Sequence, residues 1–163
     1  MKLLPLTKGY HAIVDDDDYY WVSQFNWFAL ELDNKVYARR SKKKGILKSN
    51  EPYEIYLHRV VTRCTDKTKV IDHIDHNGLN CQKDNLRICT LTENKRNIRS
   101  YNNSTSTFLG VSYDKIRNKW VAQLTHNSIK ILNKRFNTEK EAALAYDISA
   151  KTYHGTFANL NFK

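Results

Sequence analysis

The order of elements predicted over residues 70–99 constrains the fold of this chain more than any other feature of the sequence. Residues 70–75 are strand-like and end in a His-Asn-Gly turn. Residues 86–89 alternate as a second strand does, and a Thr-Leu-Thr-Glu capping box then begins a helix over residues 91–99. A strand over residues 53–57, followed directly by the start of a short helix, precedes this segment. The segment is therefore predicted to form a strand, a loop, a second strand and a helix, in that order.

Four polar side chains in this segment carry the groups that cleavage of a phosphodiester requires. The reaction needs a base that takes a proton from water and a cation that stabilises charge on the phosphate and on the leaving oxygen. Asp72 and Asn94 offer oxygen ligands of the kind that suits Mg²⁺ or Mn²⁺. The imidazole of His73, with an ordinary pKa of about 6.5, supplies a neutral base near pH 7. The side-chain oxygen of Asn85 is then expected to hold the second ring nitrogen of His73.

Helical spacing supports the inclusion of Asn94. Leu91, Asn94 and Ile98 share one face of the predicted helix. With Leu91 and Ile98 packed inward, Asn94 points at the strand end that carries the Asp-His pair. A polar side chain in an inward stripe needs a polar partner, and a metal ion is one. The structural alternative is that the Asp-His pair occurs by chance and that Asn85 caps a turn.

Residues 1–51 form the N-terminal region. The four acids of residues 15–18 precede an aromatic run, which favours the start of a helix. The alternative, a calcium loop, lacks the required Gly and distal Glu. Residues 28–32 and 36–40 predict a strand hairpin. The lysines of residues 42–44 follow, and either a solvated loop or contact with phosphate explains them.

The C-terminal part, residues 108–163, is a second α+β module. Residues 109–113, 119–125 and 129–136 predict three strands, and a second capping box begins a helix. The polar stretch over residues 100–107 is the predicted linker. One face of the helix carries small and aromatic residues at helical spacing, which predicts a packing surface: Ala142, Ala145, Tyr146, Ser149 and Tyr153.

The net charge of +10 over 163 residues indicates a polyanionic partner, of which nucleic acid is the commonest. An anionic membrane competes, but no stretch approaches the roughly 18 apolar residues of a membrane span, and the first residues are too short for a signal peptide. The three cysteines are odd in number and form no Cys-x-x-Cys pair, so we expect buried free thiols, a reducing cytosol and no zinc.

Basic residues concentrate between positions 95 and 135, where a single acid occurs. Alternation over residues 119–125 puts Trp120 and Leu124 on one face of a strand and Gln123 on the other. A sheet face of this kind can enter a major groove, with Lys and Arg on phosphates and Gln on base edges, although a solvated basic face is the alternative. The predicted DNA contacts are Arg87, Lys95, Arg96, Arg99, Lys115, Arg117, Lys119, Gln123, Lys130, Lys134 and Arg135.

Three stretches of the middle segment carry a known signature. They read IDHIDHNGLN from residue 71, DNLR from residue 84 and TENKRN from residue 92. Together they resemble the signature of HNH homing endonucleases, which have the ββα-metal fold. The usual Asp-Gly-Asn of the loop is Asp-His-Asn here, and the extra histidine is interpreted as a loop residue.

The resemblance assigns roles to the same four residues. It implies that His73 is the general base, that Asp72 and Asn94 are metal ligands, and that Asn85 orients the histidine. The last position is His in many members and Asn in the phage-type enzymes, which Asn94 matches. Some members carry zinc-binding cysteine pairs, and this chain does not.

The C-terminal part carries a second resemblance. The runs FLGV from residue 108, KWVAQ from 119, FNTEKEAA from 136, AYD from 145 and GTFANLNF from 155 resemble the APETALA/ethylene-response-factor DNA-binding domain. That family reads the major groove with a three-stranded antiparallel sheet backed by one helix. The plant pattern has arginines near Leu109 and Ser112 that are absent here, so its sequence preference is not carried over. The opening LPLTKG and VDD resemble phage and bacterial HNH proteins with such a tail.

We therefore predict an α+β chain with an N-terminal region over residues 1–51, an HNH nuclease core over 52–99, a linker over 100–107 and a DNA-binding domain over 108–163. The expected activity is hydrolysis of double-stranded DNA with Mg²⁺ or Mn²⁺, by a monomer or homodimer, in the cytoplasm of a bacterial or phage-infected cell. The alternatives are a non-catalytic DNA-binding regulator with a retired core and a protein that binds or cuts RNA.

Overall fold

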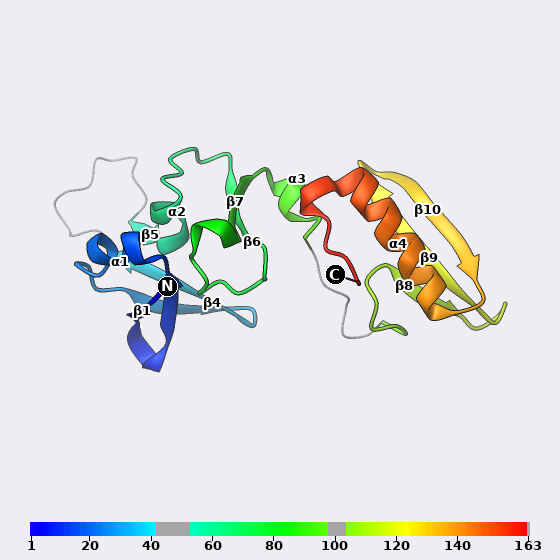
Figure 1. The fold of residues 1–163 in the computed structure, drawn as a ribbon, viewed down its shortest axis with the longest axis horizontal. Helices are drawn as coiled ribbons and strands as arrows, with labels where there is room; N and C mark the ends of the chain where they lie inside the picture. Colours follow the sequence, from blue (N-terminus) through cyan, green and yellow to red (C-terminus); the bar gives the residue numbers. More distant parts are fainter. Residues whose placement is uncertain (42–52, 98–103, 163) are drawn as a thin grey trace. The chain divides into compact units, whose positions relative to one another are not determined.

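In the part of the chain that the structure describes, the strands are short and antiparallel and form four small sheets. The structure is a computed structural model that describes residues 1–41, 53–97 and 104–162. The chain folds into two compact units, Met1–Leu91 and Thr92–Lys163, which are drawn in Figure 1. Helices and strands both contribute to the described fold, so the predicted α+β class is confirmed.

The described residues of the first unit contain seven strands in three sheets. Strands β1 and β2 form a hairpin, β3, β4 and β5 form a three-stranded sheet in that order, and β6 pairs with β7. The strands span β1 (Lys2–Pro5), β2 (His11–Val14), β3 (Phe28–Leu32), β4 (Lys35–Ser41), β5 (Glu54–Tyr56), β6 (Val70–His73) and β7 (Leu86–Cys89). The helices span η1 (Thr7–Gly9), α1 (Asp16–Val22), α2 (Leu57–Val61) and η2 (Lys83–Asn85).

One hydrophobic core joins the N-terminal region to the β6–β7 hairpin. Val14 of β2, Leu57 of α2 and Cys81 of the loop before β7 are fully buried in this core. Further members come from β1, α1, β4, β6 and β7: Leu4, Val22, Ala38, Ile71 and Leu86. Burial of these apolar side chains is what holds the elements together. The two stretches that the sequence separates at residue 51 therefore share one interior.

The predicted helix over residues 91–99 is shorter in the structure. Helix α3 (Leu91–Asn94) crosses the boundary between the two units. The amides of Arg96 and Asn97 then donate to carbonyls only three residues earlier, which makes turns in place of an α-helix. Leu91 is 56% exposed, so the prediction that it packs inward is wrong. Ile98 lies outside the described residues.

The second unit is a three-stranded antiparallel sheet packed on one long helix, as predicted (Figure 1). The strands span β8 (Val111–Asp114), β9 (Lys119–His126) and β10 (Ile129–Phe136), with β9 in the middle. Helix α4 (Glu139–His154) begins with the predicted capping box, in which Thr138 and Glu141 hydrogen-bond to each other's backbone amides. A short helix, η3 (Gly155–Phe157), follows directly.

The buried face of α4 is rotated from the predicted one. Ala142 and Tyr146 are buried as expected, but Ala143 and Ala150 complete the face, and Tyr153 is 44% exposed. The small residues let α4 lie close to the sheet, and Gly110 lies directly against the Tyr146 ring of that helix. Its φ is +71°, and a Cβ there would lie 2.1 Å from the Tyr146 ring, so only glycine fits.

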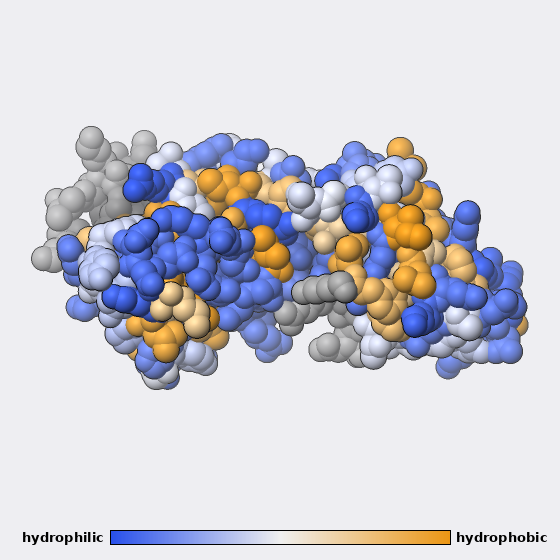
Figure 2. Space-filling model, in the orientation of Figure 1, coloured by the Kyte–Doolittle hydropathy of each residue, from blue (hydrophilic) through white to orange (hydrophobic). Residues whose placement is uncertain are grey.

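The exposed surface differs between the two units in the view of Figure 2. Hydrophilic residues cover most of the face of the first unit, whereas hydrophobic residues gather over α4 in the second. Leu144 and Ile148, four residues apart on α4, are 44% and 70% exposed. Among the described helices, none is both long enough and apolar enough to cross a membrane.

Candidate active site

Strand β6 carries the predicted catalytic pair at its C-terminal end. Asp72 is 4% exposed and His73 is 7% exposed, which is unusual for polar side chains. In the register of β6 with β7, Asp72 lies opposite Arg87 and His73 lies opposite Leu86. Successive side chains of a strand point to opposite faces, so the two residues meet different neighbours.

Asp72 is held by Arg87 in an ion pair. The Nε atom of Arg87 lies 3.1 Å from Asp72 Oδ2, and Nη2 of the same guanidinium contacts the same oxygen. The exposed fractions of the two side chains are only 17% for Arg87 and 5% for Asp72. Arg87 was predicted to contact DNA, but in this structure its guanidinium neutralises the buried carboxylate. The Asp72 carboxylate thus lies in a site that already accommodates positive charge.

Burial keeps the His73 imidazole neutral. It lowers the pKa of His73 to about 4, although the carboxylates of Asp75 and Asp72 act in the opposite direction. At pH 7 the ring therefore carries a lone pair that can accept a proton, which is what a general base requires.

A hydrogen-bonded loop follows His73. The side-chain oxygen of Asn85 accepts from the backbone N–H of Asp75 at 3.1 Å, and its Nδ2 donates to Asp75 Oδ1 and to the Asn80 carbonyl, each at 2.9 Å. Asn85 was expected to hold the His73 ring, whereas these contacts support the loop that leaves His73. Burial raises the pKa of Asp75, but hydrogen bonds from Asn80, Asn77 and Asn85 more than offset it, so this carboxylate stays charged.

The N-terminal region fixes the far end of the same loop. Ile13 donates to the Leu79 carbonyl and accepts from the Cys81 amide, both at 2.8 Å. Asp15 accepts from the Lys83 backbone amide at 2.9 Å, and Asp18 accepts from the Lys83 ammonium at 2.9 Å. The acids that were predicted to begin a helix therefore do so in α1, and two of them also bind the loop at Lys83.

The sequence analysis missed two aromatic neighbours of His73. The ring of His58, from α2, lies edge-on to it with centroids 5.1 Å apart and an interplanar angle of 87°. The ring of Tyr37, from β4, lies 6.0 Å away. Tyr56 stacks on His58 at 5.4 Å. No short-range pattern connects these positions, although a histidine directly after a predicted strand was a visible signal.

The second metal ligand falls in the other unit. Asn94 ends α3 in the second unit, whose position relative to the first is not determined. The pairing of Asn94 with Asp72 therefore stays a prediction. Within the described ranges no three His, Cys, Asp or Glu side chains gather as a metal cluster. The predicted metal ligands are only two, one carboxylate and one amide, so they do not form a cluster of that kind.

The outer face of the β8–β9–β10 sheet carries several of the predicted DNA contacts. Directly opposed strand residues share a face, and the registers place Gln123 opposite Asn133 and Lys130 opposite Thr125. The face away from α4 consists of Ser112, Asp114, Lys119, Val121, Gln123, Thr125, Lys130, Asn133 and Arg135. Apart from Asp114, which is paired with arginine, this face presents hydrogen-bonding and basic groups around one buried valine.

The remaining predicted contacts are placed differently. Lys115 and Arg117 lie in the β8–β9 turn, where Asp114 binds Arg117 at 3.4 Å. Lys134 lies opposite Ala122, which belongs to the face covered by α4, so it does not share the outer face. Arg99 lies outside the described residues, as do the lysines of residues 42–44.

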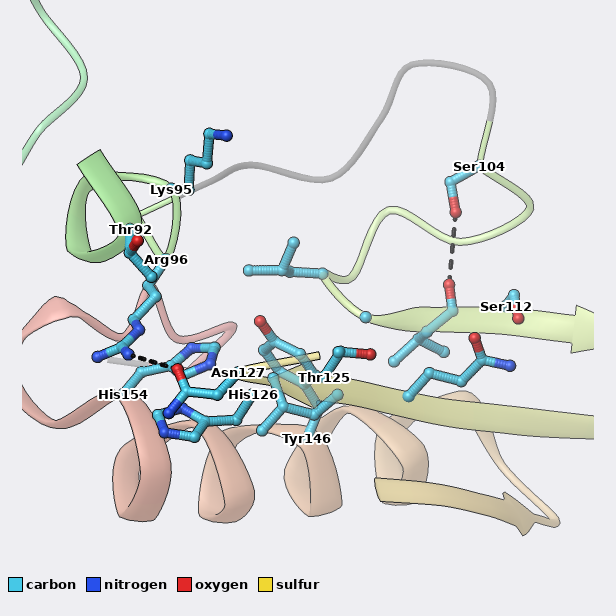
Figure 3. Close-up of a pocket in the computed structure, with 15 residues that line it drawn as sticks. Thr92, Lys95, Arg96, Ser104, Ser112, Thr125, His126, Asn127, Tyr146 and His154 are labelled. Atoms are coloured by element: carbon cyan, nitrogen blue, oxygen red, sulfur yellow. Dashed lines mark hydrogen bonds between the residues drawn. The ribbon is translucent and has the colours of Figure 1, made fainter. Parts of the chain in front are cut away.

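Lys95 and Arg96 line a cavity of about 480 Å³ within the second unit (Figure 3). Arg96 donates to Asn127 Oδ1 at 3.4 Å, and the rings of His126 and His154 lie beside it with centroids 5.6 Å apart. Burial, helped by Arg96 and His126, lowers the pKa of His154. This end of the second unit therefore combines two cations with neutral imidazole.

One of two related proteins is similar to this chain over nearly its whole length. A protein of Acanthamoeba polyphaga mimivirus, named as an uncharacterized HNH endonuclease, is 30% identical over 164 residues, which covers 98% of this chain and 79% of that protein. Protein 3.8 of Escherichia phage T7 is 35% identical over 88 residues, which covers 54% of this chain and 72% of that protein. Neither a family model nor a solved structure matches the chain.

Proposed function

Because this chain belongs to the HNH endonuclease family, we propose that it is a metal-dependent endonuclease that hydrolyses phosphodiesters of double-stranded DNA. The observation that carries this proposal is the pair of buried, consecutive residues at the end of β6, in which the His73 imidazole is neutral and the Asp72 carboxylate already binds a cationic group. A neutral imidazole next to a carboxylate in sequence supplies the two groups that metal-assisted hydrolysis needs, a base and a cation ligand.

In the proposed mechanism, His73 takes the proton from the attacking water. Its ring is neutral over the physiological range, so the proton has a site to occupy. Asn85 supports this step indirectly, because its three hydrogen bonds fix the loop that leaves His73.

Asp72 and Asn94 are the residues proposed to hold a divalent cation. Their carboxylate and amide oxygens suit Mg²⁺ or Mn²⁺. A bound cation would supply stabilisation of the charge that develops on the phosphate and on the leaving oxygen. Asp72 is already paired with Arg87, so a cation held by Asp72 would provide charge neutralisation of the kind that the guanidinium provides in this structure.

The outer face of the second unit is proposed to hold the DNA. Its lysines and arginine suit phosphates, while Gln123 and Asn133 lie opposite each other and suit base edges. The similarity to the APETALA/ethylene-response-factor pattern supports the same face as the one that meets the duplex.

Supercoiled plasmid tests the proposal directly. The purified protein should nick or linearise the plasmid with Mg²⁺ or Mn²⁺, and EDTA should stop the reaction. His73→Ala should lose activity by at least about a hundredfold, as the loss of a general base does, while DNA binding stays near that of the parent. His11→Ala, which removes an exposed histidine of β2, is the matched control. A wild-type protein that binds DNA without cutting it would favour the regulator, and preference for RNA in competition would favour the RNA-directed alternative.

A further inference from the structure

The buried ring of His58 is not explained by packing alone. Its Nδ1 atom has no hydrogen-bond partner in the described part of the chain and is removed from solvent. Burial lowers the pKa of His58 to about 3, with the neighbouring His73 and Arg59 adding to the effect. An unsatisfied buried nitrogen destabilises a protein. The role of His58 is therefore sought in the contacts that its ring makes with the neighbouring rings.

His58 is fixed by the element that carries it. Leu57 and Val61 of α2 are buried in the core of the first unit on either side of it in sequence. The guanidinium of Arg59 donates to the Lys69 carbonyl at 3.0 Å and to the Asp66 carbonyl at 2.5 Å, which ties α2 to the chain that enters β6. Helix α2 and strand β6 are therefore joined by a shared core and by these hydrogen bonds.

The rings around His73 restrict its orientation. His58 meets it edge-on at 5.1 Å, and Tyr37 meets it at 6.0 Å and an interplanar angle of 58°. The ring of Tyr37 also contacts His58, with centroids 5.9 Å apart, and the ring of Tyr56 stacks on His58. Edge-to-face contacts favour one ring angle over others. The rotation of the His73 imidazole is therefore limited from two directions.

We propose that His58 is a positioning residue that sets the ring plane of His73, and that Tyr37 and Tyr56 hold His58 in that position. The proposal rests on the proposed function, because it assigns His73 the role of the base. His58 acts through ring contact and does not itself exchange a proton with substrate. A base that is misplaced by a small distance loses much of its rate even when DNA binding is intact.

Three substitutions separate ring contact from other roles. His58→Phe keeps an aromatic ring at the same place, His58→Gln keeps an N–H and an oxygen without a ring, and His58→Ala removes both. With plasmid cleavage as the assay, His58→Gln and His58→Ala should lower kcat by roughly ten- to a hundredfold. KM for DNA should change less than about twofold, because substrate binding is left intact. His58→Phe should stay within about threefold of the parent.

Thermal unfolding of each variant completes the test, and His58→Gln serves if His58→Ala does not fold. Near-parental kcat in His58→Phe, together with a thermal unfolding midpoint close to that of the parent, supports the positioning role. Activity in His58→Gln with loss in His58→Phe would assign the role to the ring nitrogens and overturn the proposal. Parental kcat in all three variants, or losses of kcat that follow losses of stability, would also overturn it. A wild-type protein that cuts no DNA would instead contradict the proposed function, so the two failures are distinguishable.

Discussion

Removal of Arg87 should destabilise the first unit far more than removal of an ordinary surface arginine. The Arg87–Asp72 pair is largely removed from solvent, with 17% of the Arg87 side chain and 5% of the Asp72 side chain exposed. Breaking a buried pair from one side leaves the other charge with less compensation, which typically costs about 3–5 kcal/mol. Because the guanidinium keeps some contact with solvent, we expect Arg87→Ala to lower the free energy of unfolding by about 3 kcal/mol. For a unit of this size, the midpoint of thermal unfolding should then fall by more than about 10 °C.

Urea and thermal unfolding followed by circular dichroism measure this loss. Glu31→Ala is the control within the same unit, because its ion pair with Lys8 is exposed, with 49% and 60% of the side chains accessible. That change should lose less than about 1 kcal/mol. The double change Asp72→Leu with Arg87→Met should lose less than Arg87→Ala alone, since no charge is left in the interior.

The comparison also tests the cation site. If Asp72 holds a cation in solution, Mg²⁺ should raise the midpoint of Arg87→Ala more than that of the parent, because the competing guanidinium is gone. An Arg87→Ala variant that loses less than about 1 kcal/mol would refute the reasoning from burial. Equal stabilisation of both proteins by Mg²⁺ would refute the role of Asp72 as a ligand.

Three further predictions concern other parts of the molecule. Gly78→Ala should lower the free energy of unfolding in urea by about 1–3 kcal/mol, because the new Cβ would lie 2.5 Å from a β4 carbonyl and 2.8 Å from Tyr37. Unchanged stability would show that the loop moves to accommodate the methyl group. In the native protein a thiol reagent should modify Cys64 first, since burial raises the pKa of Cys81 to about 12; fast labelling of Cys81 would contradict this. Lys130→Ala should lower the slope of log affinity against log salt by about one, measured by fluorescence anisotropy, if its ammonium binds phosphate; an unchanged slope would exclude that contact.

Local signals in the sequence were sufficient for most of the described elements. The hairpin of β3 and β4, the acids that begin α1 and the capping box of α4 each depend on residues a few positions apart, and each is confirmed. Such features follow from backbone geometry and short-range hydrogen bonds, which the sequence displays directly. The antiparallel order of β10, β9 and β8 follows from short turns between successive strands.

The features that failed or were missed depend on contacts between distant residues. The ion pair of Arg87 with Asp72 was missed because it follows from the register of β7 with β6, whereas contact of Arg87 with DNA stays a prediction. His58 carried no motif, and only the packing of α2 brings its ring to His73. The helix after Leu91 was predicted from a capping box alone, and tertiary context decides where such a helix ends.

The interior shared by β2 and the β6–β7 hairpin has a consequence for protein engineering. A fusion protein designed from the HNH signature alone would include only residues from about position 53 onward as its nuclease fragment. This fragment would lack Val14 of the core. It would also lack the Ile13 amide and carbonyl, which hydrogen-bond to the loop at Leu79 and Cys81. The smallest unit that keeps every residue of the proposed nuclease site therefore begins with β1, and a chimaera should be joined after Asn94, so that both proposed metal ligands stay in it.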